Sequence, residues 1–162
     1  MPAERYIDID GLRARCLFAG ETGPPVVLIH GLGASAEIWS SSIGPLASRH
    51  RVFAPDLPGF GRTEKPGTMD YSPAAYSRFI RDFMAALGIG RAALVGHSLG
   101  GGVALRVTLD DPRHVERLVL ASSAGLGSDV SLPLRIASLP FFDRLFFKPP
   151  LPVFTRFLHR LV

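Results

Sequence analysis

A serine between two glycines in the middle of the chain carries the clearest chemical signal in the sequence. Residues 96–100 (GHSLG) have the glycine-x-serine-x-glycine spacing of a nucleophile elbow. They follow a continuously apolar run, residues 92–95 (AALV), and precede a helical pattern. Such a sharp strand-to-helix turn holds its serine in a strained backbone conformation, and bulkier residues in place of Gly96 and Gly100 would collide across it. We therefore predict that Ser98 is a nucleophile.

A second glycine-rich segment is placed to supply hydrogen-bond donors for the same reaction. Residues 30–33 (HGLG) follow another apolar run, residues 26–29 (VVLI). Acyl transfer develops negative charge on an oxygen, and two preorganised N–H donors stabilise that charge. We predict that the backbone amides of Leu32 and Leu99 are these donors. Six neighbours are expected to shape the site: His30, which braces the loop, and Gly31, Gly33, Gly96, His97 and Gly100.

A third segment, residues 56–63 (DLPGFGRT), has the composition of a tight, rigid turn that follows a strand. Its proline restricts the backbone, and its two glycines permit sharp changes of direction. We expect this turn to shape the rim of the site, with Asp56 paired to Arg62 across it.

The second segment also permits a different function. Residues 31–36 fit the glycine fingerprint of dinucleotide-binding domains, and Asp56 ends the next strand about 20 residues on, where a ribose-binding acid would lie. Two features oppose this alternative. A hairpin pattern precedes the strand, whereas the fingerprint normally follows a first strand, and the elbow at Ser98 has no role in it. A nicotinamide-binding domain is therefore the less favoured alternative.

Alternating strand and helix patterns place these segments on a sheet. Residues 6–10 and 12–18, joined at Gly11, predict an antiparallel hairpin at a sheet edge. The later apolar runs do not alternate, which is typical of strands covered by helices on both faces. These runs are residues 26–29, 52–54, 92–95 and 118–121. We therefore predict an α/β fold with a mostly parallel sheet and right-handed crossovers.

The helices between these strands differ in how clearly the sequence marks them. In the clearest one, Ser72 is a good N-cap, Pro73 takes the first helical position and Gly88 follows the end. One face of that helix is apolar: Tyr76, Phe79, Ile80, Phe83 and Leu87. Residues 38–46 predict a helix that is interrupted or bent at residues 44–45 (GP).

Taken in order, the three segments HGLG, DLPGFGRT and GHSLGG resemble the α/β-hydrolase family over about residues 5–126. The resemblance implies that Ser98 is the nucleophile and that the amides of Leu32 and Leu99 form the oxyanion hole. It also implies a small-molecule substrate, and neither a metal nor an organic cofactor. Relatives with an aspartate nucleophile, such as haloalkane dehalogenases and epoxide hydrolases, are disfavoured because this sequence has a serine at that position.

In that family the catalytic acid and histidine usually follow later strands, beyond a helical cap inserted after the sixth strand. We therefore expect residues 1–126 to be the N-terminal part of a hydrolase core and residues 127–162 the start of the cap. The triad acid, the triad histidine and the C-terminal half of the fold would then be missing, which leaves apolar surface exposed and favours aggregation. His159 and Asp129 are weak substitutes for the missing triad residues. Three other histidines are expected to keep their side chains away from the reacting atoms: His50, His97 and His114.

The resemblance implies an esterase- or lipase-like serine hydrolase that forms an acyl-enzyme on Ser98 and releases it with water. A cofactor-free C–C bond hydrolase or a haloperoxidase-like enzyme has the same elbow and stays an alternative. Because a serine without a base is a weak nucleophile, we expect the 162-residue chain alone to be inactive. A non-catalytic, truncated relative that acts as a binding module is a further alternative.

Composition and charge exclude several other classes of protein. The net charge of +4 comes from residues 130–162, because residues 1–129 carry as many acidic as basic side chains. We expect that basic, phenylalanine-rich segment to be a solvated outer face of the cap and not a nucleic-acid site. A single cysteine, Cys16, excludes an internal disulfide framework and a cysteine-based zinc site. The sequence has no run apolar enough for a membrane helix and no secretory signal, so we expect a cytoplasmic protein.

Overall fold

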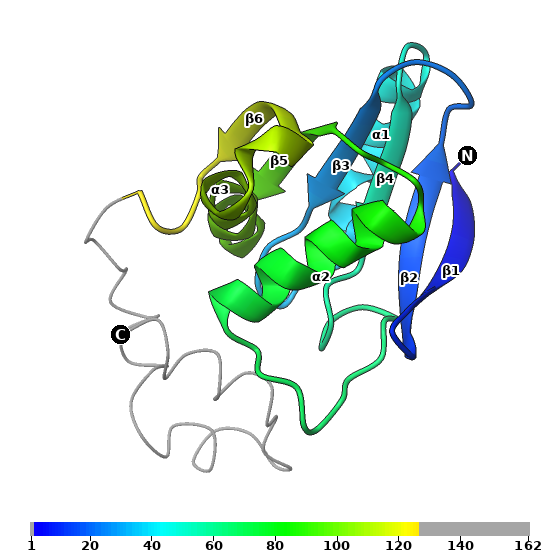
Figure 1. Ribbon diagram of the computed structural model, residues 1–162. Coiled ribbons are helices and arrows are strands. Elements are labelled where there is room, and N and C mark those ends of the chain that lie inside the picture. The colour runs from blue at the N-terminus through cyan, green and yellow to red at the C-terminus, as the bar shows by residue number, and fades with distance from the viewer. Residues whose placement is uncertain (1, 127–162) are drawn as a thin grey trace.

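The computed structural model describes residues 2–126, which form a six-stranded sheet with the strand order β1-β2-β4-β3-β5-β6 (Figure 1). The strands are β1 (Ala3–Ile9), β2 (Leu12–Ala19), β3 (Pro25–Ile29), β4 (Arg51–Pro55), β5 (Ala92–His97) and β6 (Val115–Ala121). β1 and β2 form the predicted antiparallel hairpin at one edge, and β2 is also antiparallel to β4. The strands β4, β3, β5 and β6 are parallel. The predicted α/β fold with a mostly parallel sheet is confirmed.

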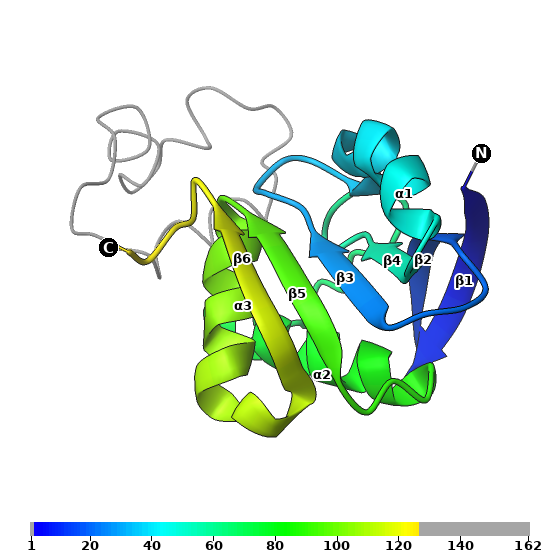
Figure 2. The ribbon, with the colours of Figure 1, turned by 90° about the horizontal axis from the view of Figure 1, so that it is seen from above.

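The order of the parallel strands creates one place where a ligand site is expected. From β3 the chain crosses to β4 on one side and then returns to β5 on the other. In open α/β sheets, ligands bind outside the carboxyl ends of the strands at such a reversal. The segment after β3 begins at His30 and the segment after β5 begins at Ser98, so the two chemical motifs lie at this reversal (Figure 2).

Helices cover the sheet on opposite faces. The helices α2 (Pro73–Ala86) and α3 (Leu99–Asp110) pack together on one face, and α1 (Ser40–Ala47) lies on the other (Figures 1 and 2). In β3, Val27 and Ile29 belong to the core cluster on the α2 side, whereas Val26 and Leu28 belong to the cluster on the α1 side. This double burial is the physical reason for the continuous apolar run in β3.

The helix α2 forms as its sequence predicts. The Ser72 side-chain oxygen accepts a hydrogen bond from the Ala75 N–H at 3.2 Å, and Pro73 takes the first position. Gly88, just after the helix, has a φ of 65°, which only glycine adopts without strain. The predicted apolar residues of this helix are buried, apart from the half-buried Leu87: Tyr76, Phe79, Ile80 and Phe83.

The sequence predicts a helix that is either interrupted or bent at residues 44–45, and the interruption is wrong. A 3-10 turn, η1 (Ala36–Trp39), is followed by α1, which continues through Pro45 to Ala47. A proline inside a helix removes the hydrogen bond to the carbonyl four residues earlier, which here belongs to Ser41. Ser41 is exposed, so solvent can satisfy that carbonyl and the helix continues.

Part of the sheet carries apolar residues that residues 2–126 do not cover. On β6, the side chain of Val119 is 52% exposed, and within the described part of the chain no strand pairs with the outer edge of β6. The expected cap, residues 127–162, lies outside the described residues. None of the helices within residues 2–126 is both long enough and apolar enough to cross a membrane.

Candidate active site

Ser98 occupies a strained turn between β5 and α3. Its φ is 53° and its ψ is −118°, a backbone conformation that costs about 1–3 kcal/mol for a residue other than glycine. The turn is held from two sides. The Ser98 carbonyl accepts hydrogen bonds from the N–H groups of Gly101 and Ala124 at 3.0 and 2.9 Å, and the Ser98 N–H donates to the Ala121 carbonyl at 3.1 Å. The end of β6 therefore helps to fix the strained serine.

The flanking glycines are required by close backbone contacts. A Cβ atom on Gly96 would collide with the Gly100 carbonyl, and a Cβ on Gly100 would collide with the carbonyls of Ile29 and His30. These backbone atoms cannot move away without opening the turn or separating α3 from β3. The predicted collision across the turn is therefore found for Gly96, whereas Gly100 is required by the close approach of α3 to the end of β3.

The two predicted segments meet at one pocket of about 300 Å³. Its lining comes from the loop after β3, from η1 and from the ends of β5 and β6: Gly31, Leu32, Ala34, Ile38, Trp39, His97, Ser98 and Ala121. A Cβ on Gly31 would lie 3.1 Å from both Ser98 Cβ and His97 Nδ1, so the loop passes very close to the serine. Most of the lining is apolar, with Ser98 and His97 as the polar side chains.

The two amides predicted to bind an oxyanion lack protein acceptors within residues 2–126. Neither the Leu32 N–H nor the Leu99 N–H donates a hydrogen bond to another described residue. Leu99 is the first residue of α3, where the helix dipole also favours negative charge. In the other loop, Gly33 has a φ of 69°, and the Ala34 N–H donates to the Gly31 carbonyl at 3.3 Å. Leu32 therefore sits within a tight turn.

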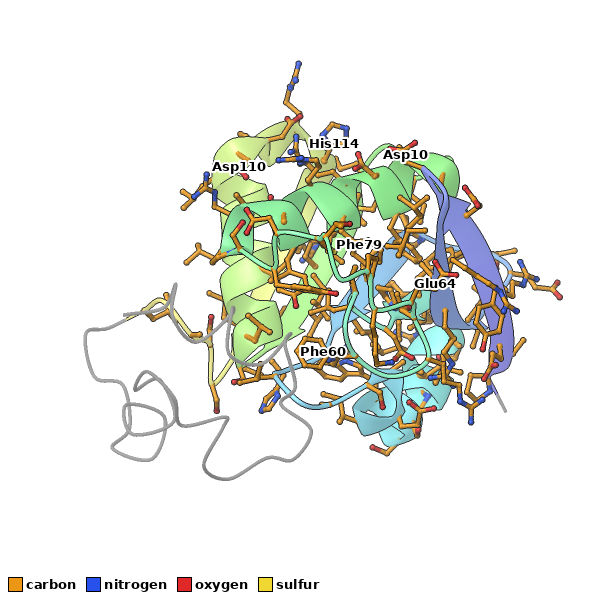
Figure 3. The ribbon with its side chains drawn as sticks, turned by 90° about the horizontal axis from the view of Figure 1, so that it is seen from below. Asp10, Phe60, Glu64, Phe79, Asp110 and His114 are labelled. Carbon is orange, nitrogen blue, oxygen red and sulfur yellow. The ribbon has the colours of Figure 1, made fainter. Side chains whose placement is uncertain are left out.

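His30 is fully buried at the start of that loop, and both of its ring nitrogens are hydrogen-bonded to backbone groups. Its Nε2 accepts a hydrogen bond from the Leu57 N–H at 2.9 Å, so its Nδ1 is the atom that donates to the Gly31 carbonyl, at 2.8 Å. Burial lowers the pKa of His30, which keeps the imidazole neutral. Phe60, labelled in Figure 3, meets the ring edge-on with 5.8 Å between the ring centroids. With both nitrogens occupied, His30 can brace the loop but has no nitrogen available to act as a base.

Asp56 makes a different pairing from the one that the sequence predicts. Its Oδ2 accepts a hydrogen bond from the backbone N–H of Arg62 at 2.8 Å, while the Arg62 guanidinium pairs with Glu4 at 2.7 Å. The absence of a side chain at Gly61 lets the backbone of the turn approach Asp56 closely, since a Cβ at this position would collide with the Asp56 carboxylate. The Oδ1 atom accepts from the Ala36 N–H at 2.6 Å. A fully buried carboxylate with both oxygens engaged is not available to bind a ribose, which weighs against the dinucleotide alternative.

The guanidinium that faces Asp56 belongs to a residue outside the predicted site, Arg15. Arg15 on β2 is only 2% exposed, and its Nη1 lies 3.2 Å from Asp56 Oδ2. It also pairs with Glu4 and Glu37. The Arg15 contact holds the pKa of Glu37 at about 2. One signal was present in the sequence, because this arginine stands next to the apolar run of residues 16–19 (CLFA) in a strand.

His97 does not point away from the site, which corrects that expectation. It is the last residue of β5 and lines the same pocket as Ser98, together with Ile38 and Trp39 from η1. On β5 the side chain of His97 shares a face with Val95, on the α1 side of the sheet, which directs it toward η1. Within residues 2–126, however, no side chain is hydrogen-bonded to the Ser98 Oγ.

The remaining histidine and acid candidates are not part of this pocket. His114 pairs with Asp111 at 3.0 Å, and Figure 3 shows His114 at the opposite end of the molecule from Phe60. The ring of His50 lies 3.2 Å from the Leu46 carbonyl, after α1. The weak candidates Asp129 and His159 lie outside the described residues.

Comparison with known proteins agrees with this geometry. A family model described as the alpha/beta hydrolase fold matches residues 24–162. The chain belongs to this family. An α/β hydrolase of known structure, a meta-cleavage product hydrolase from Pseudomonas fluorescens, is 36% identical with a TM-score of 0.76; the match covers 81% of this chain and 49% of that one.

Two curated relatives extend the comparison. An uncharacterized protein of Mycobacterium tuberculosis is 43% identical over 139 residues, which cover 86% of this chain and 40% of the relative. The 2-hydroxy-6-oxo-6-(2'-aminophenyl)hexa-2,4-dienoic acid hydrolase of Metapseudomonas resinovorans is 40% identical over 136 residues, covering 82% of this chain and 46% of the enzyme. The present α/β hydrolase chain thus spans less than half the length of these relatives.

Proposed function

We propose that this chain carries the nucleophile and the oxyanion hole of a serine hydrolase. The observation that carries the proposal is the strained Ser98 beside a pocket that Leu32 also lines, with the amides of Leu32 and Leu99 unbonded within residues 2–126. A strained serine at a helix N-terminus has few structural uses, whereas it is the arrangement that an acyl-transfer nucleophile needs.

In the proposed reaction, the Ser98 Oγ attacks a carbonyl carbon and its proton passes to a base. The carbonyl oxygen becomes an oxyanion, which the N–H groups of Leu32 and Leu99 stabilise. The leaving group takes the proton and departs, and water then hydrolyses the acyl-enzyme to an acid and free serine. We assign the base to a residue outside residues 2–126, because no histidine within that range is hydrogen-bonded to the Ser98 Oγ.

The pocket favours an apolar group next to the reacting carbonyl. Leu32, Ile38 and Trp39 line one side of it, and the described side chains there include no carboxylate, arginine or lysine. An ester of an uncharged acyl chain is therefore the first substrate class to examine.

A second candidate is hydrolysis of a C–C bond beside a ketone. It is favoured by the relative from Metapseudomonas resinovorans, whose name describes hydrolysis of a 2-hydroxy-6-oxo-hexadienoic acid. The chemistry at the acyl carbon is related, but the leaving group is a carbon that must take up a proton. The two candidates can be separated by incubating the chain with an aryl butyrate or with such a dienoate and measuring the mass of the protein. The substrate that forms an acyl adduct on Ser98 identifies the favoured candidate.

A fluorophosphonate probe tests the proposed nucleophile directly. We expect Ser98 to react faster than any other serine of the 162-residue chain, because an oxyanion hole retains part of the rate enhancement without the other triad members. Ser98→Ala should abolish the labelling. The matched control is Ser122→Ala, since Ser122 is an exposed serine that follows β6 and also has a positive φ, of 47°. Labelling spread evenly over exposed serines would support the non-catalytic alternative.

A further inference from the structure

Both ends of the loop that carries Leu32 are fastened to the two residues that follow β4. At the start of the loop, the Leu57 N–H donates to His30 Nε2 at 2.9 Å. At its end, the Ala36 N–H donates to Asp56 Oδ1 at 2.6 Å. The position of the Leu32 amide relative to Ser98 therefore depends on how firmly Asp56 is held.

Arg15 is the side chain that holds Asp56 from the hairpin side. Its Nη1 bonds Asp56 Oδ2 at 3.2 Å and Glu37 Oε2 at 2.9 Å, while its Nη2 lies 2.6 Å from Glu37 Oε1. The contact with Glu37 thus uses both nitrogens and both oxygens, a fork that only a planar guanidinium provides. Glu37 directly follows Ala36, so Arg15 holds two adjacent residues at the end of the loop: Glu37 by direct contact and Ala36 through Asp56.

The backbone of Arg15 joins the same arrangement. The Arg15 N–H donates to Thr63 Oγ1, and the Thr63 hydroxyl donates to the Asp56 carbonyl, each at 2.8 Å. The Asp56 N–H in turn donates to the Arg15 carbonyl at 2.9 Å. On the outer side, Arg15 Nη2 donates a hydrogen bond to Glu4 Oε2 at 2.9 Å, and this bond orients the guanidinium. Few degrees of freedom are left to Arg15 or to Asp56.

We propose that Arg15 is a positioning residue for the oxyanion hole: its guanidinium fixes Asp56 and Glu37, and through them the loop that presents the Leu32 amide to Ser98. The proposal rests on the proposed function of Ser98 and Leu32. It assigns to the N-terminal hairpin a role at the site, although the hairpin contributes no residue to the pocket lining.

Arg15→Lys is the test variant and Arg13→Lys is its control. Lysine retains the positive charge but has a single donor group, so it cannot hold Asp56 and both oxygens of Glu37 in one plane. Arg13 lies two residues earlier on β2, is exposed, and stacks on the Tyr6 ring at 3.9 Å. Arg13→Lys therefore makes the same arginine-to-lysine change on β2 as Arg15→Lys, but at a side chain that does not contact Asp56.

The first readout is fluorophosphonate labelling of Ser98 in the full chain, resolved into the rate at saturation and the half-saturating probe concentration. We expect Arg15→Lys to lower the saturating rate about tenfold, since even a single oxyanion donor contributes about a hundredfold or more. The half-saturating concentration should change less than about twofold, because the part of the pocket lining that comes from His97 and Ala121 does not depend on Arg15 or Asp56. Arg13→Lys should behave as the unmodified chain. An unchanged saturating rate in Arg15→Lys overturns the proposal.

The second readout is hydrogen exchange, which does not depend on reactivity. We expect faster amide exchange in residues 32–37 of Arg15→Lys, with unchanged exchange at Phe83 in the core of α2 as the reference for global stability. If Ser98 of the unmodified chain does not react at all, the proposed function fails, and exchange alone decides whether Arg15 holds the loop. Exchange in residues 32–37 that matches the Arg13→Lys control rejects that role.

Discussion

The Oδ1 atom of Asp56 accepts a hydrogen bond of 2.6 Å from the backbone N–H of Ala36. This bond joins the end of β4 to the first residue of η1, and both partners are fully buried. It closes the loop that begins at His30, so the stability of the core and the geometry of the candidate site depend on the same carboxylate.

Removal of that carboxylate should be costly. Asp56→Ala removes one of the three carboxylates that pair with the buried Arg15 guanidinium and leaves the N–H groups of Ala36 and Arg62 without their acceptor, and a buried donor left unsatisfied costs about 1–3 kcal/mol. We expect that loss in the free energy of unfolding measured with urea. Asp56→Asn is the matched comparison, because it keeps an oxygen for Ala36 while it removes the charge, and it should lose less. Equal losses in both variants would contradict the role of the Ala36 contact.

Substitution of glycine by alanine should have opposite effects in two helices. Gly100→Ala in α3 places a Cβ against the carbonyls of Ile29 and His30, so we expect a lower melting temperature and loss of Ser98 labelling. Gly44→Ala in α1 meets no atom within 4 Å and should stabilise the chain by about 0.5–1 kcal/mol, the usual helical preference for alanine. Differential scanning calorimetry of both variants checks the signs.

Ser98→Gly should make the chain more stable and unreactive at once. Glycine adopts a φ of 53° without the Cβ penalty, so relief of strain should raise the free energy of unfolding by about 1 kcal/mol or more. Ser98→Ala retains the Cβ and should abolish labelling without that gain. Chemical denaturation of the two variants measures the difference, and equal stabilities would show that the turn stores no strain at this residue.

The pH dependence of stability should include a contribution from His30. Burial lowers its pKa from the ordinary 6.5, so below about pH 6.5 the unfolded chain takes up a proton that the folded chain does not. The unfolded state then binds more protons, and this contribution to stability falls as the pH is lowered, by at most about 1.4 kcal/mol per pH unit. His30→Gln should remove that slope between pH 6.5 and pH 5, whereas His50→Gln should leave it in place. Urea titrations at four pH values provide the comparison.

The exposed apolar face of β6 should promote self-association. Val119 is 52% exposed in the middle of a strand whose outer edge has no partner among residues 2–126. A lysine there replaces an exposed apolar side chain with a second charge beside Arg117 on the same face of β6, which opposes both apolar association and strand pairing. We expect Val119→Lys to reduce light scattering and the binding of an apolar dye; scattering that does not change would assign any association to another surface.

The sequence by itself determined the elements and the chemical motif, because both depend on neighbouring residues. The cap at Ser72 and the one-sided apolar pattern of α2 act within a few positions of one another, and the structure confirms both; the collision predicted across the turn is likewise found at Gly96. Alternating runs of strand and helix were also sufficient to predict a mostly parallel sheet.

Only the tertiary structure decided which distant groups meet. Arg15 and Asp56 are 41 positions apart in the sequence, and they touch because β2 lies next to β4 in the sheet. The same strand order directs the Arg62 guanidinium to Glu4, and packing on the α1 side places His97 in the pocket. A buried charge takes whichever opposite charge the strand order brings within reach, and that order is fixed by burial of the whole sheet rather than by any local pattern.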